Sequence, residues 1–182
     1  MTIWDSQMLN KIILITENRF YWLAWLVFAL SLEISALFYQ YVLDYLPCVL
    51  CIHVRVWLLG VVAVSIFALF LYKNKYARLI SQSLMLVFSL GLLERSYQLL
   101  GTERGFVFGE CNMESGLPEW FALDSWFPSV FKIWEACGYT PELLFGITMA
   151  EALIVLSSLI TLLSIVLTVA LIFQFISQAK TD

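Results

Sequence analysis

Residues 20–43 read FYWLAWLVFALSLEISALFYQYVL, and this stretch decides the class of fold. It contains a single charged residue, Glu33. A helix needs about 20 apolar residues to cross the roughly 30 Å hydrocarbon core of a bilayer. The stretch is therefore long enough to span a membrane with some tilt, and we predict that it forms a transmembrane helix.

Three further apolar runs follow, over residues 49–71, 79–100 and 147–175. Hydrocarbon offers no water to the backbone, so each spanning segment must satisfy its own hydrogen bonds, as a helix does. We therefore predict an all-α membrane protein, a four-transmembrane-helix bundle. Residues 1–182 are expected to form one integral membrane domain.

The composition agrees with an integral membrane protein and excludes several other classes. The chain has 182 residues, of which 62% are apolar and 13% are charged, and its mean hydropathy is +0.87. Soluble domains carry about 45–50% apolar and about 25% charged residues. The 10 Lys and Arg against 14 Asp and Glu give a net charge of −4, which leaves no basic surface for a phosphate backbone. The lipid bilayer is thus expected to surround the protein, and nucleic acid is not expected as a partner.

The positions of lysine and arginine predict the orientation of the bundle. Residues 72–78, YKNKYAR, hold three basic residues, and Lys11 and Arg19 precede the first span. Short loops rich in Lys and Arg stay in the cytoplasm. The loop 101–146 has two basic residues against seven acidic ones, and the link 44–48 has no basic residue. We therefore expect both termini in the cytoplasm and both of these loops outside it.

Two cysteines lie where the second span begins, in the sequence Pro47-Cys48-Val49-Leu50-Cys51. Proline suits the first turn of a helix, so the two thiols, three residues apart, are expected on one helical face. A helix N-terminus and a nearby cation both lower the pKa of a thiol. Arg55 lies one turn deeper on the same face. Inside an apolar span it needs a partner, either the Cys51 thiolate, the carbonyl oxygens of a membrane-dissolved acceptor, or lipid headgroups reached by snorkelling.

The CxxC spacing alone is shared by zinc sites, redox dithiols and coincidence. A ribbon-type zinc site needs a second close pair, whereas Cys111 and Cys137 lie 26 positions apart. With a single histidine in the chain, His53, neither a metal centre nor haem held by two histidines is expected. A redox dithiol and a coincidental spacing therefore remain as interpretations.

Cys111 and Cys137 flank a loop that contains LPEWFALDSWFPSVF, residues 117–131. Its aromatic residues predict a surface helix that rests on the membrane. The alternative is an ordinary loop closed by one structural disulfide, which would contribute about 3 kcal/mol of stability. All four cysteines fall on the outer side, where disulfides persist.

The stretch LEISALFYQYVLDYLPCVLCIHVR, residues 32–55, resembles the hallmark of the disulfide bond formation protein B family. The loop motif of residues 117–131, between its two flanking cysteines, resembles that family's second periplasmic loop. The family comprises quinone reductases of the bacterial inner membrane. The chain departs from the usual family pattern at His53, Val54 and Ala122.

The resemblance implies a role for each cysteine. Cys111 and Cys137 match the pair that accepts electrons from a periplasmic DsbA-like thioredoxin-fold oxidase, with Cys111 forming the mixed disulfide. Cys48 and Cys51 match the pair that faces ubiquinone or menaquinone, with Cys51 meeting the quinone ring. Arg55 matches the arginine that helps to hold the quinone.

Three other interpretations stay open at this stage. A DsbI-type paralogue would perform the same chemistry for a dedicated partner. Proteins of the vitamin K epoxide reductase type also couple loop cysteines to a quinone, but their CxxC comes late in the chain, whereas here it lies at the second span. A non-enzymatic membrane scaffold would hold the four cysteines in structural disulfides.

Several polar residues have no single interpretation from sequence. Glu33 suits a hydrogen bond between helices better than a catalytic role. His53 lies on a different face from Arg55 and suits interfacial packing better than a proton shuttle. The neighbouring Glu94 and Arg95 fit either an interface pair or the border of a quinone pocket. Residues 4–13 fit a short helix on the membrane surface or a frayed terminus.

Overall fold

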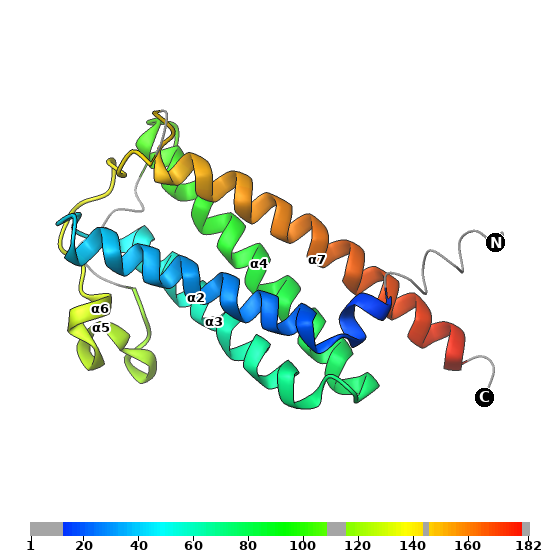
Figure 1. The fold of residues 1–182 in the computed structure, drawn as a ribbon. Coiled ribbons are helices and arrows are strands. Elements are labelled where there is room, and N and C mark those ends of the chain that lie inside the picture. Colours follow the sequence, from blue (N-terminus) through cyan, green and yellow to red (C-terminus); the bar gives the residue numbers. More distant parts are fainter. Residues whose placement is uncertain (1–12, 109–115, 144–145, 180–182) are drawn as a thin grey trace.

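Long helices form a bundle, as Figure 1 shows. The structure is a computed structural model that describes residues 13–108, 116–143 and 146–179. The helices are α2 (Arg19–Tyr41), α3 (Val49–Leu71), α4 (Lys75–Glu103) and α7 (Met149–Ala179). All four are long and apolar enough to cross a membrane. The predicted all-α four-helix membrane architecture is confirmed.

The bounds of α2 and α3 match the predicted apolar runs closely, whereas α7 ends at Ala179, four residues beyond its predicted run. Helix α4 begins at Lys75 and ends at Glu103, whereas the hydropathy predicted residues 79–100. Asn74 caps its start, because the side-chain oxygen accepts hydrogen bonds from the Tyr76 and Ala77 amides. The added turns are polar and extend the helix beyond the apolar run, so hydropathy could not detect them.

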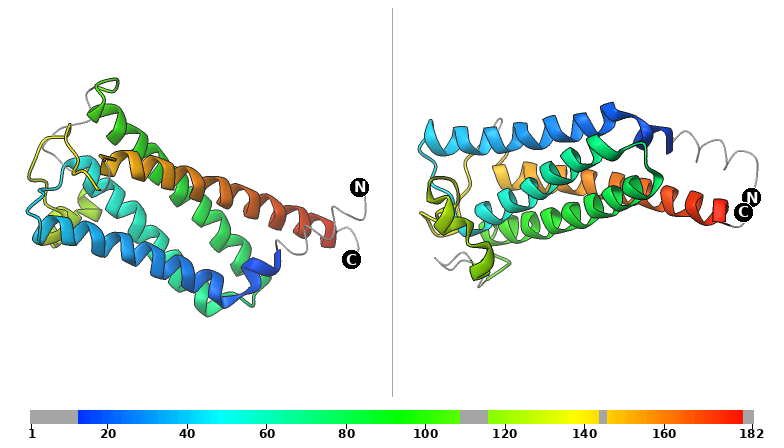
Figure 2. Two further views of the ribbon diagram at one scale, coloured as in Figure 1. Left: turned by 45° about the horizontal axis from the view of Figure 1, so that its top comes forward. Right: turned by 90° about the horizontal axis from the view of Figure 1, so that it is seen from below.

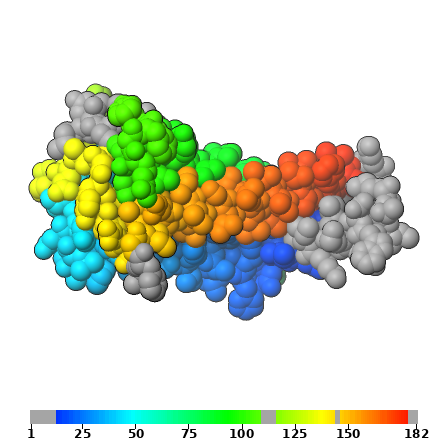
Figure 3. Space-filling model, turned by 90° about the horizontal axis from the view of Figure 1, so that it is seen from above, coloured from blue at the N-terminus to red at the C-terminus, as the bar shows by residue number. Residues whose placement is uncertain are grey.

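The bundle has two distinct ends. At the first, called here the cysteine end, α3 begins, α4 ends, and the short helices α5 (Leu123–Trp126) and α6 (Pro128–Phe131) lie close by, as Figures 1 and 2 show. At the other, called here the basic end, α3 turns into α4 through residues 72–74. Figure 3 shows α7 exposed along much of its length.

The aromatic loop segment is helical, but it is not one continuous helix. It consists of a 3-10 turn, Glu119–Phe121, followed by α5 and α6. The backbone leaves the helical region at Ala122 and Phe127, where ψ is 68° and 65°. This break turns Phe131 onto Ile52 of α3 and leaves the segment folded against the bundle. Of the predicted surface helix over residues 4–13, only Ile13 lies within the described residues.

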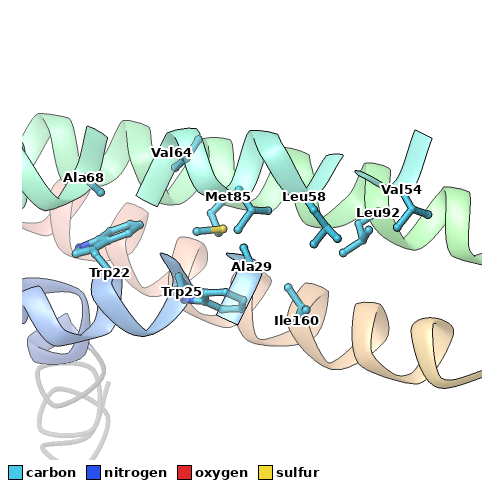
Figure 4. Close-up of a cluster of buried hydrophobic side chains, with 11 residues drawn as sticks. Trp22, Trp25, Ala29, Val54, Leu58, Val64, Ala68, Met85, Leu92 and Ile160 are labelled. Carbon is cyan, nitrogen blue, oxygen red and sulfur yellow. The ribbon is translucent and has the colours of Figure 1, made fainter. Parts of the chain in front are cut away.

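The core of the bundle lies between all four long helices (Figure 4). Trp22 and Trp25 of α2 pack there with Met85 of α4 and Ile160 of α7. The other buried members are Ala29, Val54, Leu58, Val61, Val64, Ala68 and Leu92. Helices in lipid gain little from hydrophobic burial, so close packing of such side chains is what holds them together.

Small residues let neighbouring helices approach closely. Thr161 on α7 donates its hydroxyl to the Ser89 carbonyl on α4 at 3.1 Å. Gly91 faces Trp57 of α3, and a Cβ atom there would lie 2.6 Å from the indole ring. A Cβ atom at Gly60 would overlap the Phe88 ring in the same way. The α3–α4 contact therefore requires glycine at both positions.

This contact gives a first test. Gly60→Val should lower the free energy of unfolding by about 1–3 kcal/mol, because the new side chain must displace the Phe88 ring. Ala63→Val is the matched control, since Ala63 lies on the exposed face of the same helix. Thermal unfolding in detergent measures both variants. Equal melting temperatures would contradict the packing shown by the structure.

Candidate functional site

Cys48 and Cys51 lie together at the start of α3. Cys48 is the N-cap of the helix, and its sulfur accepts a hydrogen bond from the Cys51 amide at 3.3 Å. The two sulfur atoms are 2.7 Å apart, and both thiols are free. Because an S–S bond is about 2.05 Å long, a shift of less than about 1 Å would join them. The pair can thus pass between dithiol and disulfide without moving the helix.

The surroundings of Cys48 change the acidity of its thiol. Cys48 is buried, with 3% of its surface exposed. Its hydrogen bond with Cys51, and then its burial, raise the pKa of the Cys48 thiol well above the ordinary value. A thiol with such a raised pKa keeps its proton at neutral pH.

Arg55 is buried one turn deeper, with 4% of its surface exposed. Its Nη1 donates to Gln40 Oε1 at 2.6 Å and to the Val130 carbonyl at 2.8 Å. Its Nη2 donates to the Ala36 carbonyl at 3.1 Å. The snorkelling interpretation is therefore wrong, because the guanidinium turns inward to α2 and α6.

A cavity of about 430 Å³ opens beside this arginine. Cys51 and Arg55 both line it, together with apolar side chains such as Leu32, Val54 and Leu156. Three tyrosines also face it: Tyr39, Tyr45 and Tyr139. Mostly apolar walls with a few converging polar groups are typical of a small-molecule site.

The loop before α7 reaches the cysteine pair. The Trp134 amide donates to the Pro47 carbonyl at 3.1 Å, and Glu135 forms a parallel bridge with Cys48. Two residues further on, Cys137 packs against the same apolar cluster as Cys48. Cys137 is disulfide-bonded. The fold thus packs a loop cysteine against the apolar cluster that contains Cys48, although the two residues are far apart in sequence.

The structure describes four of the five predicted site residues, and the chemical roles of all five stay predictions. Cys48, Cys51 and Arg55 lie together as the helical spacing predicted, and Cys137 joins them through the loop. Cys111 lies outside the described residues. Its predicted role stays a prediction.

Sequence reasoning missed Gln40 and the three tyrosines. Gln40 is 8% exposed, and besides accepting from Arg55 it donates to the Ser129 carbonyl at 3.0 Å. The sequence feature that could have identified Gln40 is a polar amide near the end of an apolar span, where a polar group without a hydrogen-bond partner is costly. The tyrosines gave no usable signal, because aromatic residues are common at the edges of spans.

The polar residues whose roles the sequence left open lie in different parts of the bundle. Glu33 is buried, and its Oε1 has no hydrogen-bond partner among the described residues. His53 is partly buried near the start of α3. Glu94 pairs with Arg95 at 3.2 Å, and Gln98 bonds both side chains, so these two form an ion pair on α4. Neither Glu94 nor Arg95 lines the cavity at Cys51.

Comparisons with known proteins agree on one family. The family model described as disulfide bond formation protein DsbB matches residues 18–177. Disulfide bond formation protein B of Haemophilus influenzae is 32% identical over 166 residues, covering 91% of this chain and 92% of the relative. The protein of that name from Shewanella frigidimarina is 32% identical over 136 residues, covering 74% and 80%. Disulfide bond formation protein B 2 of Pseudomonas aeruginosa is 34% identical over 136 residues, also covering 74% and 80%.

The hydrogen bonds of Arg55 generate a second test. Gln40→Leu should lower the free energy of unfolding by about 1.5–3 kcal/mol, because a buried guanidinium loses a charged hydrogen bond. Gln40→Glu keeps an acceptor oxygen and should cost clearly less. Chemical unfolding in detergent compares the two variants. An equal loss for both would argue against the Arg55–Gln40 bond as the cause.

The raised pKa of Cys48 generates a third test. Alkylation requires the thiolate, so in the reduced protein Cys48 should react with iodoacetamide only at a pH above the ordinary thiol range. Cys51→Ala removes the hydrogen bond that raises the pKa, so the alkylation profile of Cys48 should move to lower pH. Mass spectrometry of the Cys48 peptide across pH measures the shift. Identical profiles would contradict the assignment.

Proposed function

The chain belongs to the disulfide bond formation protein B family, and on that premise we propose that it is a membrane thiol:quinone oxidoreductase. It reoxidises a periplasmic DsbA-like oxidase and passes the electrons to a respiratory quinone. One observation carries the proposal: Cys51, in contact with Cys48, lines an apolar cavity together with the buried Arg55. A purely structural disulfide would need neither the cavity nor the cation.

The first half of the reaction is thiol–disulfide exchange. A thiolate of the reduced partner attacks Cys111 of a Cys111–Cys137 disulfide, and Cys137 leaves with the electron pair. The second partner thiol then attacks the partner sulfur of the mixed disulfide, which releases Cys111 and oxidises the partner. Two protons and two electrons have moved to the loop cysteines.

The second exchange links the two cysteine pairs. The Cys137 thiolate attacks Cys48, and the bond between Cys48 and Cys51 breaks with the electron pair on Cys51. Cys111 then attacks Cys137 and restores the loop disulfide, which leaves Cys48 as a thiol. The packing of Cys137 in the Cys48 cluster supports this order, because the attacking sulfur must reach the end-on position of the bond that breaks.

We assign the cavity to a membrane quinone, either ubiquinone or menaquinone. When bound, the carrier accepts two electrons and two protons and becomes the hydroquinone. The apolar lining suits its ring and tail, and the tyrosines offer faces for stacking. Arg55 lines the same cavity and would offer a hydrogen-bond donor to a carbonyl oxygen of the carrier.

The protein contributes charge stabilisation and water exclusion. Negative charge that develops on Cys51 or on the carrier oxygen is stabilised by the Arg55 cation, and this interaction is much stronger in a low-dielectric site than in water. The cation needs no reorganisation during the reaction, because the three hydrogen bonds to α2 and α6 already fix it. Re-forming the Cys48–Cys51 bond releases the two electrons and two protons that the carrier takes up.

We place the protein in the bacterial inner membrane with the cysteine end in the periplasm. The three cations of the basic end, Lys73, Lys75 and Arg78, support this orientation by the positive-inside rule. A periplasmic cysteine end gives the partner access to the loop. It also keeps all four cysteines in an oxidising compartment.

A DsbI-type paralogue would use the same residues, so partner preference is what separates it from the proposed enzyme.

A scaffold with structural disulfides is the second alternative. In a scaffold the four cysteines would stay oxidised when a reduced partner is supplied. In the proposed enzyme they become reduced, and added quinone reoxidises them.

The decisive experiment separates the two half-reactions in purified protein. Arg55→Met should slow quinone reduction about 10²–10³-fold, the usual loss for a group that stabilises developing charge. Exchange between the reduced partner and the loop cysteines should stay within about twofold, since Arg55 lies at the other pair. Stopped-flow absorbance of the quinone and trapping of the mixed disulfide follow the two steps, with both quinones tested.

Two controls make the result interpretable. Arg55→Lys keeps the positive charge and should retain more quinone reduction than Arg55→Met. Cys48→Ser and Cys111→Ser should each abolish net oxidation of the partner. If Arg55→Met slowed both half-reactions equally in folded protein, the proposed division of labour would be wrong.

A further inference from the structure

A second cavity lies at the basic end of the bundle, far from the cysteines. Its volume is about 260 Å³. Three of its eight lining residues are cations, Lys73, Lys75 and Arg78, and one is an acid, Glu17. The other lining residues are Leu79, Leu171, Gln174 and Phe175. The cavity therefore carries a net positive charge.

Arg78 is the buried member of this group, with 7% of its surface exposed. Its Nη2 forms an ion pair with Glu17 at 3.0 Å. Its Nε is also buried and has no hydrogen-bond partner among the described residues. A buried donor without an acceptor costs free energy, so the guanidinium at this cavity has donor capacity that the described residues do not use.

The start of α4 adds to the positive potential. The helix begins at Lys75, so the positive end of its dipole lies at the cavity, and such an end favours an anion. The Lys75 ammonium lies 5.4 Å from the centre of the Tyr76 ring and 5.9 Å from that of Phe175. Both distances are within the range of a cation–π contact.

We propose that this cavity binds the phosphate of an anionic phospholipid headgroup. An arginine fork and two lysines are the residues that bind phosphate oxygens, and basic pockets between helix ends at a membrane surface are known to take such headgroups. The apolar surroundings favour a lipid over free phosphate. Ile80 of α4 and Ile172 and Ile176 of α7 are exposed beside the lining residues and offer a surface for acyl chains.

The test measures lipid binding to the full chain. Purified protein, stripped of lipid by detergent exchange, is titrated with phosphatidylglycerol or phosphatidylcholine and analysed by native mass spectrometry. Phosphatidylglycerol should bind more tightly than phosphatidylcholine. Lys75→Gln should weaken phosphatidylglycerol binding roughly fivefold, and Lys73→Gln/Lys75→Gln roughly 25-fold, as expected for one and two cations near an anionic lipid.

Arg19→Gln is the matched control. Arg19 starts α2 at the same end of the bundle and lies over the Phe20 ring, but it does not line the cavity. Its loss should change binding less than twofold. If Arg19→Gln weakened binding as much as Lys75→Gln, or if phosphatidylcholine bound equally well, the binding would not be specific to this cavity. The proposed site would then be wrong.

Competition with inorganic phosphate distinguishes a site for a lipid headgroup from a site for free phosphate. At millimolar concentration it should compete only weakly with phosphatidylglycerol, because it lacks the acyl chains. Full competition would show a site for free phosphate and would overturn the lipid assignment. Melting temperatures in the absence of lipid check that each variant is folded, and Lys75→Arg, which keeps the charge, should retain binding.

Discussion

The buried Arg55 guanidinium is the constraint on which the cysteine end depends. A cation in an apolar bundle is stable only if its donors are satisfied, and its acceptors come from the Ala36 carbonyl and Gln40 on α2 and from the Val130 carbonyl on α6. Satisfying one side chain therefore joins the first span to the loop. The same bonds fix the cation beside Cys51 at the cavity. Arg55 thus connects the elements of the cysteine end and also supplies the positive charge that the proposed reaction uses.

The loop segment of residues 117–137 also contacts the start of α3. Phe131 is buried against Ile52, and the backbone of residues 134–135 pairs with that of residues 47–48. Both contacts are made at the start of α3, where the CxxC pair lies. As a result Cys137 packs against the apolar cluster that contains Cys48. A relay between two cysteine pairs needs this proximity, since exchange requires direct contact between sulfur atoms.

The two ends of the bundle differ in composition. The cysteine end combines a loop with an apolar cavity, and the proposed reaction depends on this combination. The basic end concentrates cations around the start of α4. Between them, the tryptophans of α2 and small residues such as Gly60 and Gly91 fix the distances between helices. The packing of the α2 tryptophans against α3 keeps the relative position of these two helices, and so of Arg55 and its partners on α2.

The sequence by itself determined the four spans, the pairing of Cys48 with Cys51, and the position of Arg55 one turn below them, because hydropathy and helical period act over short distances along the chain. It did not reveal that Arg55 turns inward instead of snorkelling, since its acceptors lie 15 and 75 residues away at Gln40 and Val130. Likewise, only the tertiary structure packed Cys137 against the cluster that contains Cys48 and gathered three tyrosines around one cavity. The physical reason is that contacts between separate helices and loops depend on packing in three dimensions, which no local pattern encodes.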